Sequence, residues 1–273
     1  MRAAALDVTT YRAAVHDLLA YLERPGIADP VAIIAERLVL PEFAQVLTAA
    51  QGGLKIAGNQ ILHDVRKFGA NSAHAKESLP QLVGICLLAQ IDAAWWGATP
   101  EYQSDLDVTQ SADLVDVDSD AVGFRFRRQT DAPARRLLRA AERRLLPGRT
   151  PDPVGLRFAR TRPEVVRLLN ELSAEFGRFA PAGTPPLWVT SLARSMQHQL
   201  RLRSLGYAAM LPSSHCTGYG VDIVMSWYRR YGAAGVLHQM LLERCEAGQV
   251  NVIRGAQTWH VCLSPRGAAE MGG

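Results

Sequence analysis

Apolar residues in the first hundred positions recur at helical spacing, and prolines and glycines mark where each run begins and ends. Between Tyr11 and Leu22 they fall at intervals of three and four, which predicts a helix with Thr10 as its N-cap. The same reasoning predicts further helices over residues 30–38, 41–50 and 81–96. The last run is too short to span a bilayer, and its polar Gln90 and Asp92 favour a buried core helix.

After residue 100 the pattern changes, and apolar and polar residues begin to alternate as they do in strands. Two such runs flank Asp118-Ser119-Asp120, which predicts a β-hairpin near residues 113–127. Two more helices are expected, over 132–146 and 163–179, and the prolines between residues 147 and 153 form the best candidate for a linker.

Strand-like runs rich in β-branched and aromatic residues follow in the last third of the chain. They cover residues 187–190, 221–224 and 258–263. We therefore predict an α+β fold with two parts. A mainly helical region over residues 1–150 carries the hairpin, and a small mixed domain over residues 151–273 contains an antiparallel sheet, with the motifs described below at 187–263.

Composition adds little specificity. The 273 residues are 48% hydrophobic and 21% charged with a net charge of +4, which is ordinary for a soluble globular protein. One arginine-rich stretch has no interleaved aromatic residues for base stacking, so nucleic-acid binding is not expected. It comprises Arg125, Arg127, Arg128, Arg135, Arg136, Arg139, Arg143 and Arg144.

The four cysteines show no paired spacing and are expected to be reduced thiols, which favours a cytoplasmic location. The N-terminal residues lack the apolar segment of a signal peptide, and no apolar run reaches membrane-spanning length, so no membrane association is expected.

The most specific chemistry lies in the segment from Ser213 to Asp222, which reads Ser-x-His-x-x-Gly-x-Gly-x-Asp. Asp222 falls within an apolar, strand-like run, where a carboxylate is costly unless it is paired or binds a metal. His260 lies in a second strand-like run, so adjacent strands could present both residues on one face while His215 reaches in from the loop. Two imidazoles and one carboxylate are a typical ligand set for a catalytic zinc ion with an open fourth position.

Three motifs in this order resemble those of the zinc D-Ala-D-Ala carboxypeptidases and D,D-dipeptidases, which share a fold with the hedgehog signalling domain. The first is Ser191-x-x-Arg194-Ser195-x-x-x-Gln199, and the second is the segment that ends at Asp222, where Gly220 replaces the usual alanine. The third is the family's Glu-x-x-His, which reads Gln257-x-x-His260 here. The resemblance covers about residues 185–265.

The resemblance implies a role for each matching residue. One zinc ion per chain would be bound by His215, Asp222 and His260. The guanidinium of Arg194 would point at a substrate carbonyl or carboxylate and stabilise the developing oxyanion. The residues expected to position substrate or to support the ligands are Ser191, Gln199, Ser213 and Trp259.

Gln257 departs from the family at its catalytic base. The family's glutamate takes a proton from water and delivers it to the leaving amine, and an amide cannot do this. Another base could replace it, with Glu243, Glu246 or His238 on the preceding helix as candidates. Alternatively, water on the zinc needs no strong base for an easier substrate, or the protein binds without hydrolysing.

The first hypothesis for function is a zinc-dependent peptidase or amidase that acts on a short peptide or peptide-like small molecule. The alternatives keep the metal but change the chemistry: a biosynthetic tailoring enzyme, or a non-hydrolytic zinc-binding interaction protein. A cytoplasmic location would favour a dipeptide or a cell-wall precursor over mature peptidoglycan as the substrate.

Overall fold

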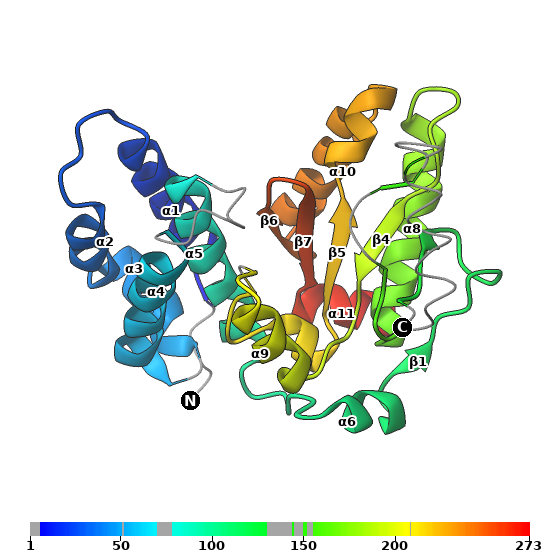
Figure 1. Ribbon diagram of the computed structural model, residues 1–273, viewed down its shortest axis with the longest axis horizontal. Helices are drawn as coiled ribbons and strands as arrows, with labels where there is room; N and C mark the ends of the chain where they lie inside the picture. The colour runs from blue at the N-terminus through cyan, green and yellow to red at the C-terminus, as the bar shows by residue number, and fades with distance from the viewer. Residues whose placement is uncertain are drawn as a thin grey trace.

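The computed structural model describes residues 6–50, 52–69, 78–129, 144, 150–151, 155–207 and 209–273. It contains a helical unit, α1 to α5, and a sheet unit, which is the chain from α6 onward (Figure 1). The combination of helices and sheet confirms the expected mixed class. The helix predicted over 132–146 and the linker candidate fall almost entirely outside the described residues.

The element bounds are as follows. The helical unit contains α1 (Val8–Leu22), α2 (Pro30–Leu38), α3 (Pro41–Ala49), α4 (Gly53–Gly69) and α5 (Leu79–Trp96). Helices of the sheet unit are α6 (Asp105–Gln110), α8 (Pro163–Phe179), α9 (Met196–Ser204), α10 (Ala234–Glu246) and α11 (Pro265–Gly272), with short 3-10 helices η1 (Ser214–Thr217) and η2 (Ser226–Tyr231). Its strands are β1 (Val115–Asp116), β2 (Arg125–Phe126), β3 (Arg160–Thr161), β4 (Trp188–Ser191), β5 (Gly220–Val224), β6 (Val250–Arg254) and β7 (Thr258–Leu263).

The helices of the helical unit form where the apolar spacing predicts them. In α1, Tyr11, Val15 and Leu18 lie on one buried face. The N-cap of α1 is Asp7 rather than Thr10: the Asp7 carboxylate accepts a hydrogen bond from the Thr10 backbone N–H at 3.0 Å. A carboxylate is favoured there because it also faces the positive end of the helix dipole.

Helix α4 is not predicted by the sequence analysis. Its buried residues Ala57, Ile61 and Val65 are spaced by four, but polar residues separate them and no proline or cap residue marks the start. Packing against α3 and α5 supplies the stabilisation that local sequence signals lack.

The predicted hairpin near residues 113–127 does not form. β1 pairs with β3, whereas β2 pairs in parallel with β4 and becomes an edge strand of the main sheet. The buried side chains of Val117 and Phe124, which flank the turn, pack in the core of the sheet unit. An isolated two-stranded hairpin would bury much less apolar area, so each strand takes a more distant partner.

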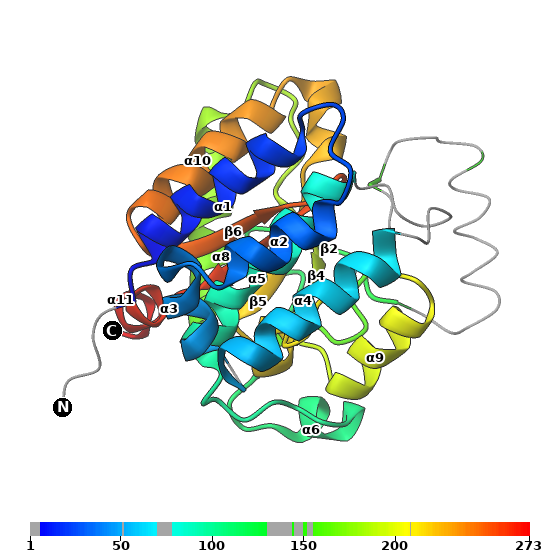
Figure 2. The same ribbon diagram turned by 90° about the vertical axis from the view of Figure 1, so that its left-hand side faces the viewer.

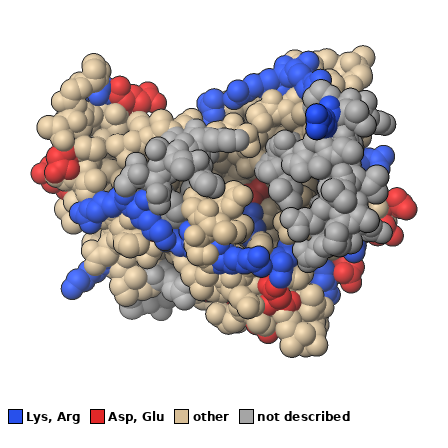
Figure 3. Space-filling view, in the orientation of Figure 1, with Lys and Arg blue, Asp and Glu red and all other residues tan. Residues whose placement is uncertain are grey.

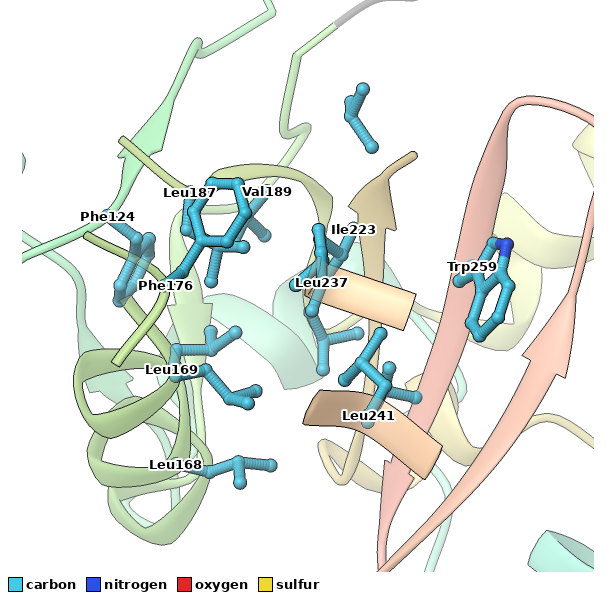
Figure 4. Packing of buried hydrophobic residues seen from close by; sticks show 14 of the residues in the cluster. Phe124, Leu168, Leu169, Phe176, Leu187, Val189, Ile223, Leu237, Leu241 and Trp259 are labelled. Atoms are coloured by element: carbon cyan, nitrogen blue, oxygen red, sulfur yellow. The ribbon is translucent and has the colours of Figure 1, made fainter. Parts of the chain in front are cut away.

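The main sheet has the strand order β2-β4-β5-β7-β6, and all neighbours except β2 and β4 run antiparallel. Its core face carries Val221 and Ile223 of β5 and Trp259 and Val261 of β7, packed against α8 and α10 (Figure 4). The alternate residues, which include Asp222 and His260, point to the opposite face.

Helix α5 packs near that opposite face, against β6. By length and composition α5 is the one described helix that could cross a membrane, and more than half of that stretch is buried inside the molecule. Figures 1 and 2 place the helical unit beside the β6 edge of the sheet. The indole N–H of Trp96, at the end of α5, donates to the Leu263 carbonyl of β7 at 2.8 Å.

The helical and sheet units have separate hydrophobic cores. One runs from Tyr11 to Ala93 and the other from Val117 to Met271. Along the chain, the first core therefore ends and the second begins before residue 150, the position at which the sequence analysis divides the two parts. The difference arises because β2 and the residues around it belong to the sheet unit.

Candidate metal centre

Three side chains from different elements converge on the opposite face of the sheet, over its inner strands: His215 of η1, Asp222 of β5 and His260 of β7, called the ligand triad below. His215 Nε2 lies 3.2 Å from Asp222 Oδ1 and 3.1 Å from His260 Nδ1. His260 Nδ1 lies 3.2 Å from the same Asp222 oxygen. The structure therefore brings together the three residues that the sequence analysis predicts as metal ligands.

The strand register and two glycines produce this arrangement. Asp222 and His260 are directly opposite each other in the pairing of β5 with β7. Gly218 ends η1 at φ 83°, a left-handed conformation that favours glycine. At Gly220 a Cβ would come within 2.7 Å of the Ser214 hydroxyl, which gives a physical reason for glycine where the family has alanine.

His215 is oriented by a backbone carbonyl. Its Nδ1 lies 2.8 Å from the Leu192 oxygen, so Nδ1 carries the proton and Nε2 presents a lone pair to the triad. Burial, followed by the positive charge of Arg194, lowers the pKa of His215 to about 4. The ring is therefore neutral near pH 7, which is the form that binds a metal.

His260 is held by a carboxylate from the helical unit. Its Nε2 lies 2.8 Å from Asp92 Oδ2 of α5, and its Nδ1 faces the triad. Burial alone would lower the pKa of His260, but hydrogen bonds to Asp222 and Asp92 outweigh it and raise the pKa to about 9. The metal-free ring is therefore protonated at neutral pH and pairs with both carboxylates.

Asp222 divides its two oxygens between the triad and an arginine. Oδ1 faces both imidazoles, and Oδ2 accepts a hydrogen bond from Arg194 Nη2 at 2.5 Å. Burial would raise the pKa of Asp222, but the charges of His215 and Arg194 and the hydrogen bonds to His215 and His260 hold it well below its usual range. The carboxylate is ionised and available as a ligand.

Arg194 joins the first and second motifs. Its Nε donates to Ser191 Oγ at 2.7 Å and its Nη1 to Gln199 Oε1 at 3.2 Å, and its third contact is Asp222. Its backbone N–H donates to the His215 carbonyl at 3.0 Å. Ser191 and Gln199, which we expected to position substrate, therefore hold Arg194 in the structure.

Trp259 does not line this face, and its expected role in positioning substrate is not supported. It alternates with His260 along β7, so it points into the core of the sheet unit, where it is 5% exposed and packs edge-on against His238 of α10 at 4.8 Å between ring centroids. His238, Glu243 and Glu246, the candidate bases, all lie on α10, and α10 covers the core face of the sheet, opposite the triad. A base on α10 would be separated from the triad by the sheet itself.

Ser213 and Gln257 flank the triad in sequence. Ser213 is nearly buried and precedes η1, and its backbone carbonyl accepts a hydrogen bond from Cys216. Gln257 lies in the turn between β6 and β7, half-buried, and its carbonyl accepts hydrogen bonds from the backbone N–H groups of Met225 and Ser226. The backbone of the Gln257 turn is thus fixed to the end of β5, three residues before His260.

The donor set fits a metal ion. One ring nitrogen from each imidazole and one carboxylate oxygen lie within 4.8 Å of one another, and each ring is anchored through its other nitrogen. This is the arrangement in which outer hydrogen bonds orient imidazole ligands. The triad could therefore hold a metal ion; the geometry alone does not distinguish one metal from another.

Two residues near the centre are missed by the sequence analysis. Asp92 appears there only as a polar residue in an apolar helix, although a carboxylate in such a helix requires a buried partner. His198 of α9 gives no signal in the sequence. Burial, Arg194 and Arg157 lower its pKa to about 4, and among the described residues its buried Nδ1 has no hydrogen-bond partner.

The arginine-rich stretch of the sequence is only partly described by the structure. Several of the arginine-rich stretch lie outside the described residues, and those described include Arg125, Arg127 and Arg128 near β2. On the face drawn in Figure 3, basic side chains occur at several places, with acidic side chains at both ends of the molecule.

No protein-family model, curated protein or solved structure matches the chain. The resemblance to zinc peptidases therefore rests on the three motifs.

Proposed function

We propose that this protein is a zinc-dependent hydrolase of the peptidase or amidase type, acting on a short peptide or a peptide-like small molecule. The observation that carries the proposal is the convergence of the ligand triad, with each ring anchored through one nitrogen so that the other nitrogens face the same point. Three protein ligands of these types leave a fourth position open in catalytic zinc sites. Bound there, zinc would act as a Lewis acid toward a carbonyl and would lower the pKa of water.

Arg194 is the residue proposed to bind the substrate carbonyl. A guanidinium has five N–H groups in a rigid fork, and three of them donate to Ser191, Gln199 and Asp222. These contacts fix the plane of the guanidinium beside the ligand triad. A preorganised donor of this kind stabilises negative charge that develops on a carbonyl oxygen during amide cleavage.

Gln257 limits the chemistry that the chain can perform. An amide has no proton to exchange near pH 7, so Gln257 can orient a water molecule or a substrate by hydrogen bonding but cannot act as the base. The acids and the histidine of α10 lie across the sheet and do not replace it. The proposed substrate is therefore one whose cleavage does not depend on a strong protein base.

The presence of Gln257 where a base is expected also favours a second candidate function. With Gln257 at the base position, the centre could bind a peptide-like ligand without cleaving it, or could serve a biosynthetic tailoring step that uses the metal for another acyl transfer. We expect the protein to work in the cytoplasm, because its four cysteines are free thiols, three of them buried.

The test is zinc content together with hydrolysis. Purified protein is expected to retain about one zinc per chain and to hydrolyse at least one member of a panel of L,L-, L,D- and D,D-dipeptides and N-acyl amino acids. His215→Ala should lose both properties. A wild-type protein that binds no zinc would overturn the proposal, whereas one that binds zinc and cleaves nothing on the panel would favour the non-hydrolytic alternative.

A further inference from the structure

Asp92 is a buried carboxylate that the proposed mechanism has not yet used. It lies on α5, 3% exposed, and its hydrogen-bond partners among the described residues come from the sheet unit. Its Oδ2 contacts His260 Nε2 at 2.8 Å and accepts from Ser214 Oγ at 2.8 Å, and its Oδ1 accepts from Asn251 Nδ2 at 2.8 Å. A carboxyl group so far from water needs partners of this kind.

We propose that Asp92 is the positioning residue of the metal centre: it accepts the Nε2 proton of His260 and thereby holds the Nδ1 lone pair toward the metal. The inference rests on the proposed metal site. In metal centres, a carboxylate behind a histidine ligand fixes the ring and its tautomer and makes the imidazole a stronger donor.

Asn251 determines which kind of atom residue 92 can place on each side. Its Oδ1 accepts from Arg12 Nη2 at 3.1 Å, and its Nδ2 donates both to the Leu88 carbonyl at 2.9 Å and to Asp92. The amide of Asn251 can therefore present only its NH₂ group to Asp92. The atom of residue 92 that faces Asn251 must be an oxygen.

This constraint predicts the effect of an amide at position 92. In Asp92→Asn, the new oxygen would turn to Asn251, and the new NH₂ group would face His260 Nε2. A donor at that place favours an unprotonated Nε2, so the proton would move to Nδ1 and block the nitrogen that binds the metal. The substitution keeps the size of the side chain but selects the wrong tautomer.

The inference also gives the helical unit a function. Asp92 and its neighbour Leu88 belong to α5, while His260, Ser214 and Asn251 belong to the sheet unit. The residues that hold His260 are thus shared between the two units. The metal centre is complete only when α5 is packed against β6.

The experiment measures zinc affinity of the folded, full-length protein by competition with a chromophoric chelator. Asp92→Asn is expected to bind zinc 10- to 100-fold more weakly than wild type, the usual effect of removing an outer carboxylate. Asp64→Asn is the matched control, because Asp64 is another buried carboxylate of the helical unit but contacts Arg203 rather than the triad. The control should keep wild-type affinity.

A second readout reports the tautomer. In zinc-loaded wild type, ¹⁵N NMR of the imidazole groups should find the His260 proton on Nε2. In Asp92→Asn that proton should be lost from Nε2 or found on Nδ1, which a merely structural role for Asp92 would not cause. If Asp92→Asn does not fold, Asn251→Ala tests the same contacts and should weaken zinc binding several-fold.

The outcomes separate the two proposals. A folded Asp92→Asn protein with wild-type zinc affinity and an unchanged Nε2 proton would overturn the role of Asp92 and leave the proposed function standing. If Asn251→Ala has to be used instead, unchanged zinc affinity in that variant would likewise overturn the role of Asp92. Failure of the wild type itself to bind zinc would overturn the proposed function and, with it, this inference.

Discussion

Asp222 and His260 occupy directly opposed positions on β5 and β7, and their side chains meet at 3.2 Å on the face away from α10. Side chains alternate between the two faces of a strand, so a one-residue slip of β7 would bring Trp259 to this face and send His260 into the core. The apolar side chains of Trp259 and Val261 in that core therefore fix the register that assembles the ligand triad.

Removal of one ligand is expected to abolish tight metal binding. His215→Ala leaves two of the three donors of the triad, so purified protein should contain far less than one zinc per chain. His238→Ala removes a histidine on the far side of the sheet and should leave zinc content unchanged. Elemental analysis by mass spectrometry measures both; full zinc in His215→Ala would rule out the ligand assignment.

Arg194→Lys is expected to reduce turnover although the charge is kept. An ammonium cannot hold Ser191, Gln199 and Asp222 together as the planar guanidinium does. The loss should be about 100-fold, the size of a missing oxyanion donor. Steady-state kinetics on the best substrate of the panel, with zinc content measured beside it, provide the check. Wild-type turnover in this variant would leave Arg194 with a structural role only.

Gln257→Glu should raise the hydrolysis of simple dipeptides if the amide merely occupies the position of a lost base. A positioned general base contributes typically 100- to 10,000-fold, so the gain would be easy to measure. If the native reaction needs a neutral amide there, the same substitution should instead reduce the native activity. A zinc-loaded Gln257→Glu protein that behaves as wild type in both assays would exclude Gln257 from the mechanism.

Zinc affinity should depend on pH because a proton competes for His260. The pKa of His260 is raised to about 9 in the metal-free protein, so below that pH its Nδ1 carries the proton that a metal must displace. Affinity should rise up to about tenfold per pH unit between roughly pH 7 and 9 and then level off. His215, with a pKa lowered to about 4, is neutral throughout this range and adds no slope. Chelator competition across pH tests this, and a flat profile would contradict it.

The buried pair between Arg203 of α9 and Asp64 of α4 should matter for stability rather than for the metal. The two side chains are 8% and 3% exposed, with a shortest contact of 2.6 Å. Arg203→Met would leave the Asp64 carboxylate without its charge partner and should cost roughly 3–5 kcal/mol of unfolding free energy in urea titrations. Arg266→Ala, which breaks an exposed pair with Glu270, should have little effect.

The parts of the fold that local sequence determines could be predicted. Pro30 and Pro41 stand in the first turns of α2 and α3, and proline there has its backbone angle already set for a helix. The ligand triad was predictable because His215 and Asp222 are only seven residues apart and His260 matches a third ordered motif. Strand alternation could also have placed Trp259 correctly, since it is adjacent to His260.

Other features depend on partners distant in sequence, which local patterns do not specify. β1 and β2 each have a strand-like pattern, but nothing in it indicates that one pairs with β3 and the other with β4. The contact between Asp92 and His260 spans 168 residues. Local sequence marks Asp92 as an unusual residue in α5 but cannot name its partner, which only the packing of two units determines.

The separation of the two hydrophobic cores suggests a place to cut the chain, but the contacts around β6 argue against it. A fragment that starts at residue 151 would lack β2 and would expose the fully buried Asn251 amide, which now bonds Leu88 and Asp92. It would also leave His260 with water in place of a carboxylate behind its ring. The smallest autonomous fragment that preserves the centre should therefore begin before α5. A fragment of residues 151–273 alone should hold the His260 ring only loosely and leave it open to water.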